Sequence, residues 1–431
     1  MARFLQEQVP AQGTEPPHLP RDDTHRVLSE VLRAFLSSRL LIWIVGLTTA
    51  LLIGVAPQHS VALEPIAHFT RPFSSHLLNV LVSPGARYDS AWYLSIAGLG
   101  YVHSVQTVFF PLYPVVVTLL GSTGVPIVIA GILLSAAFAI GALYLLYRLV
   151  ELDQGPTMAR KTVWIVAWLP VALFLSAVYS EALFMLLTVG SIYAARRDRW
   201  WLAGALGCLA AGTRNSGVLL VAPLLLLYLY GPRVKPASKR IANRLRPRYE
   251  VRWDIAWIAL VPVGMIAYLV YLHFAIGHPF APFSAERHWS RVFIPLGGIP
   301  LGIYAAIKSL VGIIPGFDPK LASHLSTMKV IRHTVELAFL MLDGGLLWFG
   351  RRRLPIAYTA FAALSLVMAV SVPGRAEPLK SLPRFTLVIF PLWISLALWA
   401  DEKRRSRAIL LILPLLLAGW SFLFTGWYWA G

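Results

Sequence analysis

The sequence is poor in charged residues and in cysteine. Charged side chains make up 13% of its 431 residues and hydrophobic ones 57%, which excludes the composition of an ordinary soluble domain. The single cysteine, Cys208, excludes a disulfide or a thiolate metal cluster within the chain. The apolar stretches also lack the alternation of polar and apolar residues that barrel strands need, so no barrel is expected.

Long hydrophobic runs are abundant instead. Several approach or reach the roughly 20 residues that cross a bilayer; they lie at 40–55, 127–147, 255–276, 356–372 and 409–424. Because lipid offers the backbone no hydrogen-bond partners, each run is expected to be helical. The sequence therefore predicts an all-α polytopic membrane protein, with one transmembrane domain over residues 34–431.

Basic residues outnumber acidic ones, 38 to 20, and they cluster beside the hydrophobic segments. The clusters at 196–199, 233–252, 351–353 and 403–407 follow the positive-inside rule, so we expect contact with membrane lipids and no nucleic-acid partner. The same rule places the N-terminus in the cytoplasm. The first 26 residues are polar and rich in Pro, so we expect residues 1–33 to be a disordered tail. Residues 56–108 then form a long first extracytoplasmic loop, and loops of this length are usually functional.

The basic clusters also limit the number of membrane spans. Placing them all inside gives roughly 11 transmembrane helices, at 34–55, 126–149, 162–178, 180–195, 200–213, 216–230, 254–276, 334–349, 354–372, 383–400 and 407–427. The segments 109–121 and 292–314 are interrupted by Pro and Gly and are expected to be re-entrant or interfacial. If both cross, the count becomes roughly 13.

The most distinctive segment lies in the predicted first loop. It reads Arg87-Tyr88-Asp89-Ser90-Ala91-Trp92-Tyr93, followed by Ile-Ala at 96–97, Gly-Tyr at 100–101 and Phe-Phe-Pro-x-x-Pro at 109–114. Three shorter motifs come later: Phe-x-Ser-Ala-x-Tyr-Ser-Glu at 174–181, Ala-x-Thr-Arg-x-x-Gly at 211–217 and Ser-x-Pro-Arg-Phe at 381–385. Charged groups at a membrane boundary are costly without a purpose, so Asp89, Glu181, Arg214 and Arg384 are candidate functional residues.

In their order, these motifs resemble the PIG-V family of mannosyltransferases over most of residues 30–400. Tyr88 stands where that family usually has Trp, which keeps an aromatic ring beside the Asp89 carboxylate. The resemblance implies a GT-C type glycosyltransferase fold and a polyprenyl-phosphate-mannose donor. It also implies transfer on the extracytoplasmic face, with an acid of the first external loop as the base.

The chemistry of such a transfer also points to Asp89. A sugar hydroxyl that attacks an anomeric carbon must lose its proton, and a nearby carboxylate can accept it. Apart from Glu64, near the end of the first span, Asp89 is the only acid in the loop. A single displacement predicts inversion, with Arg214 or Arg384 stabilising the departing phosphate. No cofactor is expected, and the isolated acid predicts no metal site.

The candidate substrate-binding residues each have a competing explanation. They are Arg87, Tyr88, Trp92, Tyr93, Tyr179, Glu181, Arg214 and Arg384. Aromatic residues also populate interfacial belts, Glu181 could cap a helix after Ser180, and Arg214 or Arg384 could be ordinary interfacial cations. Other external charges are weaker candidates, among them Glu286, His288, Arg375, Glu377 and Lys380.

Rival functions remain open from the sequence. A polytopic transporter or flippase of lipid-linked sugars is the main alternative, and a scaffold with a degenerate loop is another. The same fold could transfer another sugar, such as arabinose or glucose. The acceptor is expected to be a lipid or a glycan. Abundant Arg, Ala, Leu and Pro suggest a GC-rich genome, and we therefore expect a plasma-membrane location.

Overall fold

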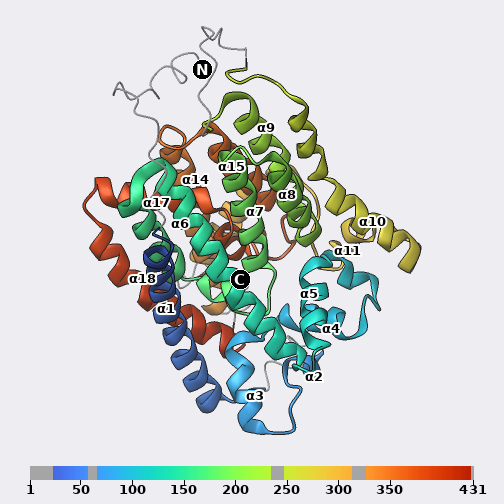
Figure 1. The fold of residues 1–431 in the computed structure, drawn as a ribbon. Helices are drawn as coiled ribbons and strands as arrows, with labels where there is room; N and C mark the ends of the chain where they lie inside the picture. The colour runs from blue at the N-terminus through green and yellow to red at the C-terminus, as the bar shows by residue number, and fades with distance from the viewer. Residues whose placement is uncertain (1–22, 57–65, 234–246, 313–326, 429–431) are drawn as a thin grey trace.

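The computed structural model describes residues 23–56, 66–233, 247–312 and 327–428. Within these ranges the structure is helical, and its only β-type pairing is one isolated antiparallel bridge between Arg291 and Gly374. The all-α prediction is thus confirmed for the described residues (Figure 1).

Three helices are long and apolar enough to cross a membrane, namely α1 (Thr24–Ile53), α6 (Ile127–Trp168) and α18 (Ser406–Thr425). A fourth candidate is formed by η7 (Trp253–Leu260) and α10 (Val263–Ile276), which meet at a bend of 40°. Several other apolar helices have only 10–17 residues. The chain is therefore built like a membrane protein, while the count of roughly 11 to 13 spans stays a prediction.

The remaining elements are shorter or less apolar. They are α2 (Ala67–Thr70), α3 (His76–Val82), η3 (Ser83–Gly85), α4 (Ser90–Leu99), η4 (Ser104–Val108), α5 (Leu112–Gly121), η5 (Ala172–Leu175), α7 (Glu181–Arg196), α8 (Trp200–Thr213), η6 (Asn215–Leu220), α9 (Val221–Tyr230), α11 (Ala281–Ala285), α12 (Gly298–Val311), α14 (Thr327–Gly350), α15 (Ile356–Val370), α16 (Leu382–Leu387) and α17 (Phe390–Glu402). The predicted first loop is thus largely helical where it is described. Its helices α2, α3 and α4 gather with α5 at the end of the molecule opposite α9 (Figure 1).

The first helix begins earlier than hydropathy predicts. It starts at Thr24, so the disordered tail predicted for 1–33 is wrong for residues 24–33, and residues 1–22 lie outside the described part. Val27 and Val31, one helical turn apart, are buried, and α1 packs against α6 and α18. Glu30 on the same stretch pairs with Arg160 of α6 at 3.1 Å. Packing thus extends the helix beyond its apolar run.

The span predicted at 162–178 ends at Trp168, because Pro170 cannot continue the helix. Residues 169–180 form a buried, irregular segment whose backbone needs polar partners inside the protein. Arg39 of α1 supplies some of them, donating to the Ala172 carbonyl at 2.7 Å and to Ser176 Oγ at 3.2 Å, and it also donates to the carbonyl of Ala167 at the end of α6 at 2.9 Å. This buried arginine therefore shapes the segment that leads to Glu181.

Candidate active site

Candidate residues from distant parts of the sequence line one cavity of about 590 Å³. Its walls include eight of the nine residues selected from the sequence: Tyr88, Asp89, Trp92, Tyr93, Tyr179, Glu181, Arg214 and Arg384. They come from the start of α4, the turn before α7, the end of α8 and α16. Folding therefore brings these motifs together at a single site.

The backbone turns sharply at Asp89. Tyr88, just before it, has a left-handed φ of 52°, and α4 begins just after it at Ser90. The Asp89 amide donates to the Tyr179 hydroxyl at 3.2 Å, and that hydroxyl donates to the Arg87 carbonyl at 3.0 Å. Aspartate at this position usually caps the helix, but the Asp89 side chain makes no capping bond. Its carboxylate is turned toward the cavity instead.

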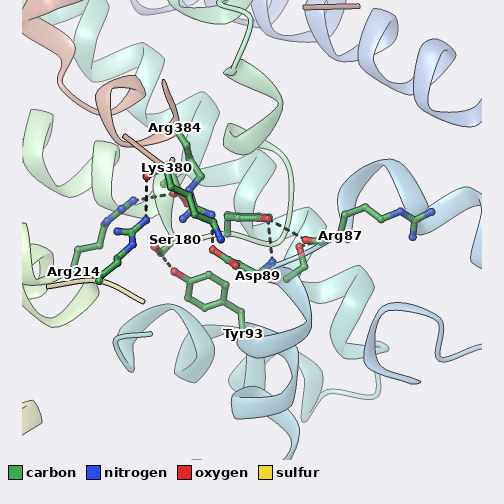
Figure 2. A network of polar contacts seen from close by, with 11 residues as sticks. Arg87, Asp89, Tyr93, Ser180, Arg214, Lys380 and Arg384 are labelled. Atoms are coloured by element: carbon green, nitrogen blue, oxygen red, sulfur yellow. Dashed lines mark hydrogen bonds and ion pairs between the residues drawn. The ribbon is translucent and has the colours of Figure 1, made fainter. Parts of the chain in front are cut away.

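Two acids and two arginines alternate across the cavity wall (Figure 2). Asp89 Oδ2 lies 2.5 Å from Arg384 Nη1, and Arg384 Nε lies 3.4 Å from Glu181 Oε1. The same Glu181 oxygen accepts a hydrogen bond from Arg214 at 3.0 Å. Glu181 is only 1% exposed, so these arginines supply the compensation that a buried carboxylate needs. Its main contacts are therefore with the arginines and not with the helix end.

Arg214 is held by the turn between α8 and η6. Gly217, within η6, approaches the end of α8 so closely that a Cβ there would lie 2.4 Å from the Ala210 carbonyl carbon. The turn directs Arg214 inward, over the rings of Phe184 at 5.7 Å and Phe385 at 5.3 Å. Arg214 thus points at Glu181 rather than snorkelling to an interface.

Arg87 does not line the cavity, and the geometry does not support the substrate contact predicted for it. Its side chain is fully buried and points away from Asp89 (Figure 2). Its Nε donates to the Thr425 carbonyl at 3.3 Å, and its guanidinium lies over the Trp427 ring at 5.2 Å. Arg87 therefore connects the Asp89 turn to the end of α18.

Aromatic rings form another wall of the cavity. Trp92 lies 6.2 Å from Phe109 in a stacked arrangement and 5.7 Å from Trp289 edge to face. Tyr93 is buried and shares a hydrogen bond of 2.8 Å with Ser180 Oγ. Tyr179 is also buried, at 1% exposure. These tyrosines face the protein interior, which argues against the interfacial-belt interpretation for them.

Two cavity residues carried no signal in the sequence, Arg291 and Arg332. Arg291 follows a turn, and Arg332 lies within α14 just before a predicted span, so both resembled ordinary flanking cations. The external charges Glu286, His288 and Lys380, weaker candidates from the sequence, also line the cavity. Arg291 and Arg332 could be identified as cavity residues only once it was known which other segments pack beside them.

The acids of the cavity are not arranged as a metal site. Asp89 and Glu181 each contact arginine. Divalent cations are held by several oxygen ligands converging on one point. Among the described residues, no group of three or more His, Cys, Asp and Glu side chains could hold a metal ion.

Comparison with known proteins agrees with the order of the motifs. Residues 28–309 match the family model described as Mannosyltransferase (PIG-V). The chain belongs to this family. The PIG-V match includes Asp89, Glu181 and Arg214, whereas Lys380 and Arg384 lie beyond it.

Curated PIG-V relatives are similar over part of their length. The chain is 28% identical over 261 residues to GPI alpha-1,6-mannosyltransferase 2 of Cricetulus griseus, covering 57% of this chain and 52% of the relative. The protein of that name from Rattus norvegicus is 30% identical over 207 residues (46% and 42%), and that from Homo sapiens 27% over 274 residues (60% and 53%). The chain thus spans about half the length of the curated relatives it matches. No solved structure gives a significant match.

Proposed function

We propose that this protein is a membrane mannosyltransferase that uses a polyprenyl-phosphate-mannose donor and a lipid or glycan acceptor. The observation that carries the proposal is the Asp89 carboxylate, which faces a cavity instead of capping its own helix. Family membership supplies the reaction class. The lipid-like donor fits the apolar part of the cavity, where Phe361, Met368 and Val372 lie.

Asp89 acts as the general base in this proposal. Arg384 holds Oδ2 at 2.5 Å, which leaves Oδ1 to accept the proton of the acceptor hydroxyl. The acceptor oxygen bonds to the anomeric carbon as the bond from that carbon to the phosphate oxygen breaks. The electron pair leaves with the polyprenyl phosphate, and Asp89 later releases the proton to solvent.

Inversion at the anomeric carbon is expected of a single displacement with Asp89 as the base. A retaining mechanism needs a second carboxylate as nucleophile. Glu181 is unsuited to that role because it is 1% exposed and contacts Arg214 and Arg384. The relatives' name specifies an alpha linkage. If this chain also makes an alpha linkage, inversion requires a beta-linked donor.

The face of the membrane is inferred from the two ends of the molecule. Arg248 and Arg252 of the basic cluster attach to α9, where the Arg248 amide donates to the Leu229 carbonyl at 2.8 Å. The positive-inside rule assigns that end to the cytoplasm. The opposite end, with α2–α5, is then extracytoplasmic (Figure 1). In a bacterial cell this is the outer face of the plasma membrane.

The test is transfer of radiolabelled mannose from polyprenyl-phosphate-mannose to lipid in membranes that carry the protein. Asp89→Asn is expected to lower transfer at least about 100-fold, while Glu402→Gln, an exposed acid outside the cavity, keeps the wild-type rate. Beta-linked donor is expected to work and alpha-linked donor to fail. Wild-type transfer by a folded Asp89→Asn variant would refute the base, and movement of labelled lipid without transfer would indicate a transporter.

A further inference from the structure

The cavity contains more basic groups than its acids neutralise. Five cations line it: Arg214, Arg291, Arg332, Lys380 and Arg384. Arg384 pairs with Asp89 and Glu181, Arg214 pairs with Glu181, and Arg332 pairs with Glu377. These three arginines therefore have their countercharges within the protein.

Arg291 and Lys380 are different. Within the described ranges, neither has a carboxylate at ion-pair distance. Arg291 Nη2 donates to the Lys380 carbonyl at 3.1 Å, and the Arg291 guanidinium lies over the Phe385 ring at 5.1 Å. The Arg291 guanidinium is thus tied to the backbone of Lys380, and both side chains line the cavity. Two cations at one cavity wall without a carboxylate partner favour the binding of an anion.

Glu286 is the acid nearest in sequence to Arg291, and it compensates the charge poorly. Burial raises the pKa of Glu286, and this outweighs the opposite effect of Arg291. The pKa of Arg291 is lowered first by burial and also by Arg384 and Arg214, although Glu286 and Asp89 oppose the shift. A bound anion would compensate the desolvation of Arg291 and offset its repulsion from the other arginines.

Backbone pairing holds the Arg291 segment against the segment that leads to Lys380. The segments 290–296 and 371–375 run antiparallel, with the Ile294 amide donating to the Ser371 carbonyl at 2.8 Å and the Arg375 amide to the Ser290 carbonyl at 2.9 Å. Each cation adjoins a serine in the left-handed region, Ser290 at φ 58° and Ser381 at φ 68°. Left-handed non-glycine residues are strained, and such strain gathers at functional sites. Tyr88 beside Asp89 shows the same strain.

We propose that Arg291 and Lys380 form the subsite for the phosphate of the lipid-linked donor. Arg384 and Arg214, which the sequence suggested for this purpose, instead order the two acids. This inference rests on the proposed function, and it places the departing polyprenyl phosphate next to Arg291 and Lys380. When the bond to the anomeric carbon breaks, the phosphate gains a second negative charge. A planar guanidinium and an ammonium together match that dianion.

The experiment measures binding of a polyprenyl monophosphate to the purified full-length protein in detergent, with the uncharged polyprenol as reference. Arg291→Gln and Lys380→Gln are each expected to weaken polyprenyl phosphate binding roughly tenfold or more, without changing polyprenol binding. Lys380→Arg, which preserves the charge, should bind nearly as wild type. Lys308→Gln, a cation that does not line the cavity, is the matched control.

Three outcomes would overturn the subsite. The first is wild-type affinity for polyprenyl phosphate in a folded double variant of Arg291 and Lys380, and the second is an equal loss of polyprenol binding. The third is that the double variant loses affinity for phosphatidylinositol micelles but not for polyprenyl phosphate, which would assign the subsite to the acceptor. The binding assay needs no sugar transfer. Failed mannose transfer with intact phosphate binding would therefore count against the proposed function alone.

Discussion

The Asp89 carboxylate and the Arg384 guanidinium form an ion pair of 2.5 Å although 295 residues separate them in the chain. Arg384 also lies 3.4 Å from Glu181, so one arginine connects acids from two other segments. The proposed base is thus oriented by a residue from the C-terminal part of the chain. A change at Arg384 should therefore disturb the orientation of Asp89 as well as the charge compensation of Glu181.

Arg384→Gln is expected to lower kcat about 100-fold while changing the KM for the donor little. The reason is that Arg384 positions the base, whereas the proposed phosphate contacts are Arg291 and Lys380. Steady-state kinetics with varied donor concentration measure both constants. A large rise in KM with unchanged kcat would show instead that Arg384 binds the donor.

Tyr179→Phe removes the hydroxyl that joins the Asp89 amide to the Arg87 carbonyl. It should cost about 1 kcal/mol of stability and lower transfer roughly tenfold by loosening the turn. Tyr113→Phe is the matched control, because the Tyr113 hydroxyl is also buried and bonded, to Gly131 and Ser135, outside the cavity. Equal activity loss in both variants would mean that the effect is only structural.

Glu181→Gln is expected to lower the free energy of unfolding by about 3 kcal/mol, because it removes the carboxylate that neutralises the buried Arg384 and the partly buried Arg214. Thermal unfolding in lipid nanodiscs measures the change. Glu151→Gln, a partly buried acid paired with Arg148 at 3.4 Å away from the cavity, should have a smaller effect. A Glu181→Gln protein as stable as wild type would contradict the compensation argument.

Arg39→Met should destabilise the protein by about 3 kcal/mol, because three groups of the 167–176 segment lose their hydrogen-bond donor. Arg33→Met, on the exposed side of the same helix, is expected to have little effect. The unfolding temperatures of the two variants test this. Proteolysis near residue 170 in Arg39→Met, with the rest of the fold intact, would locate the damage.

Part of the fold and part of the candidate site were predictable from the sequence. The helical class was predictable because a backbone in lipid must satisfy its own hydrogen bonds. The Asp89 segment was recognisable because its motif is local. A substrate contact was predicted for Arg87 because it lies next to the Tyr88-Asp89 pair in the sequence. Sequence position does not say which way a side chain points, and the Arg87 side chain turns toward Thr425. The start of α1 and the end of α6 differ from the predicted span boundaries. Packing extends α1 at its start, and Pro170 ends α6, whereas the prediction used hydropathy alone.

Composition and local motifs were enough to identify a helical membrane protein, its family and its candidate acid. They were enough because hydropathy, backbone chemistry and short motifs are properties of neighbouring residues. The pairing of charges depended on folding. Arg291 and Lys380 look like ordinary cations along the chain, and only the folded structure brings both to the wall of one cavity. An electrostatic site is a property of distances through space, and those distances arise only when the segments pack.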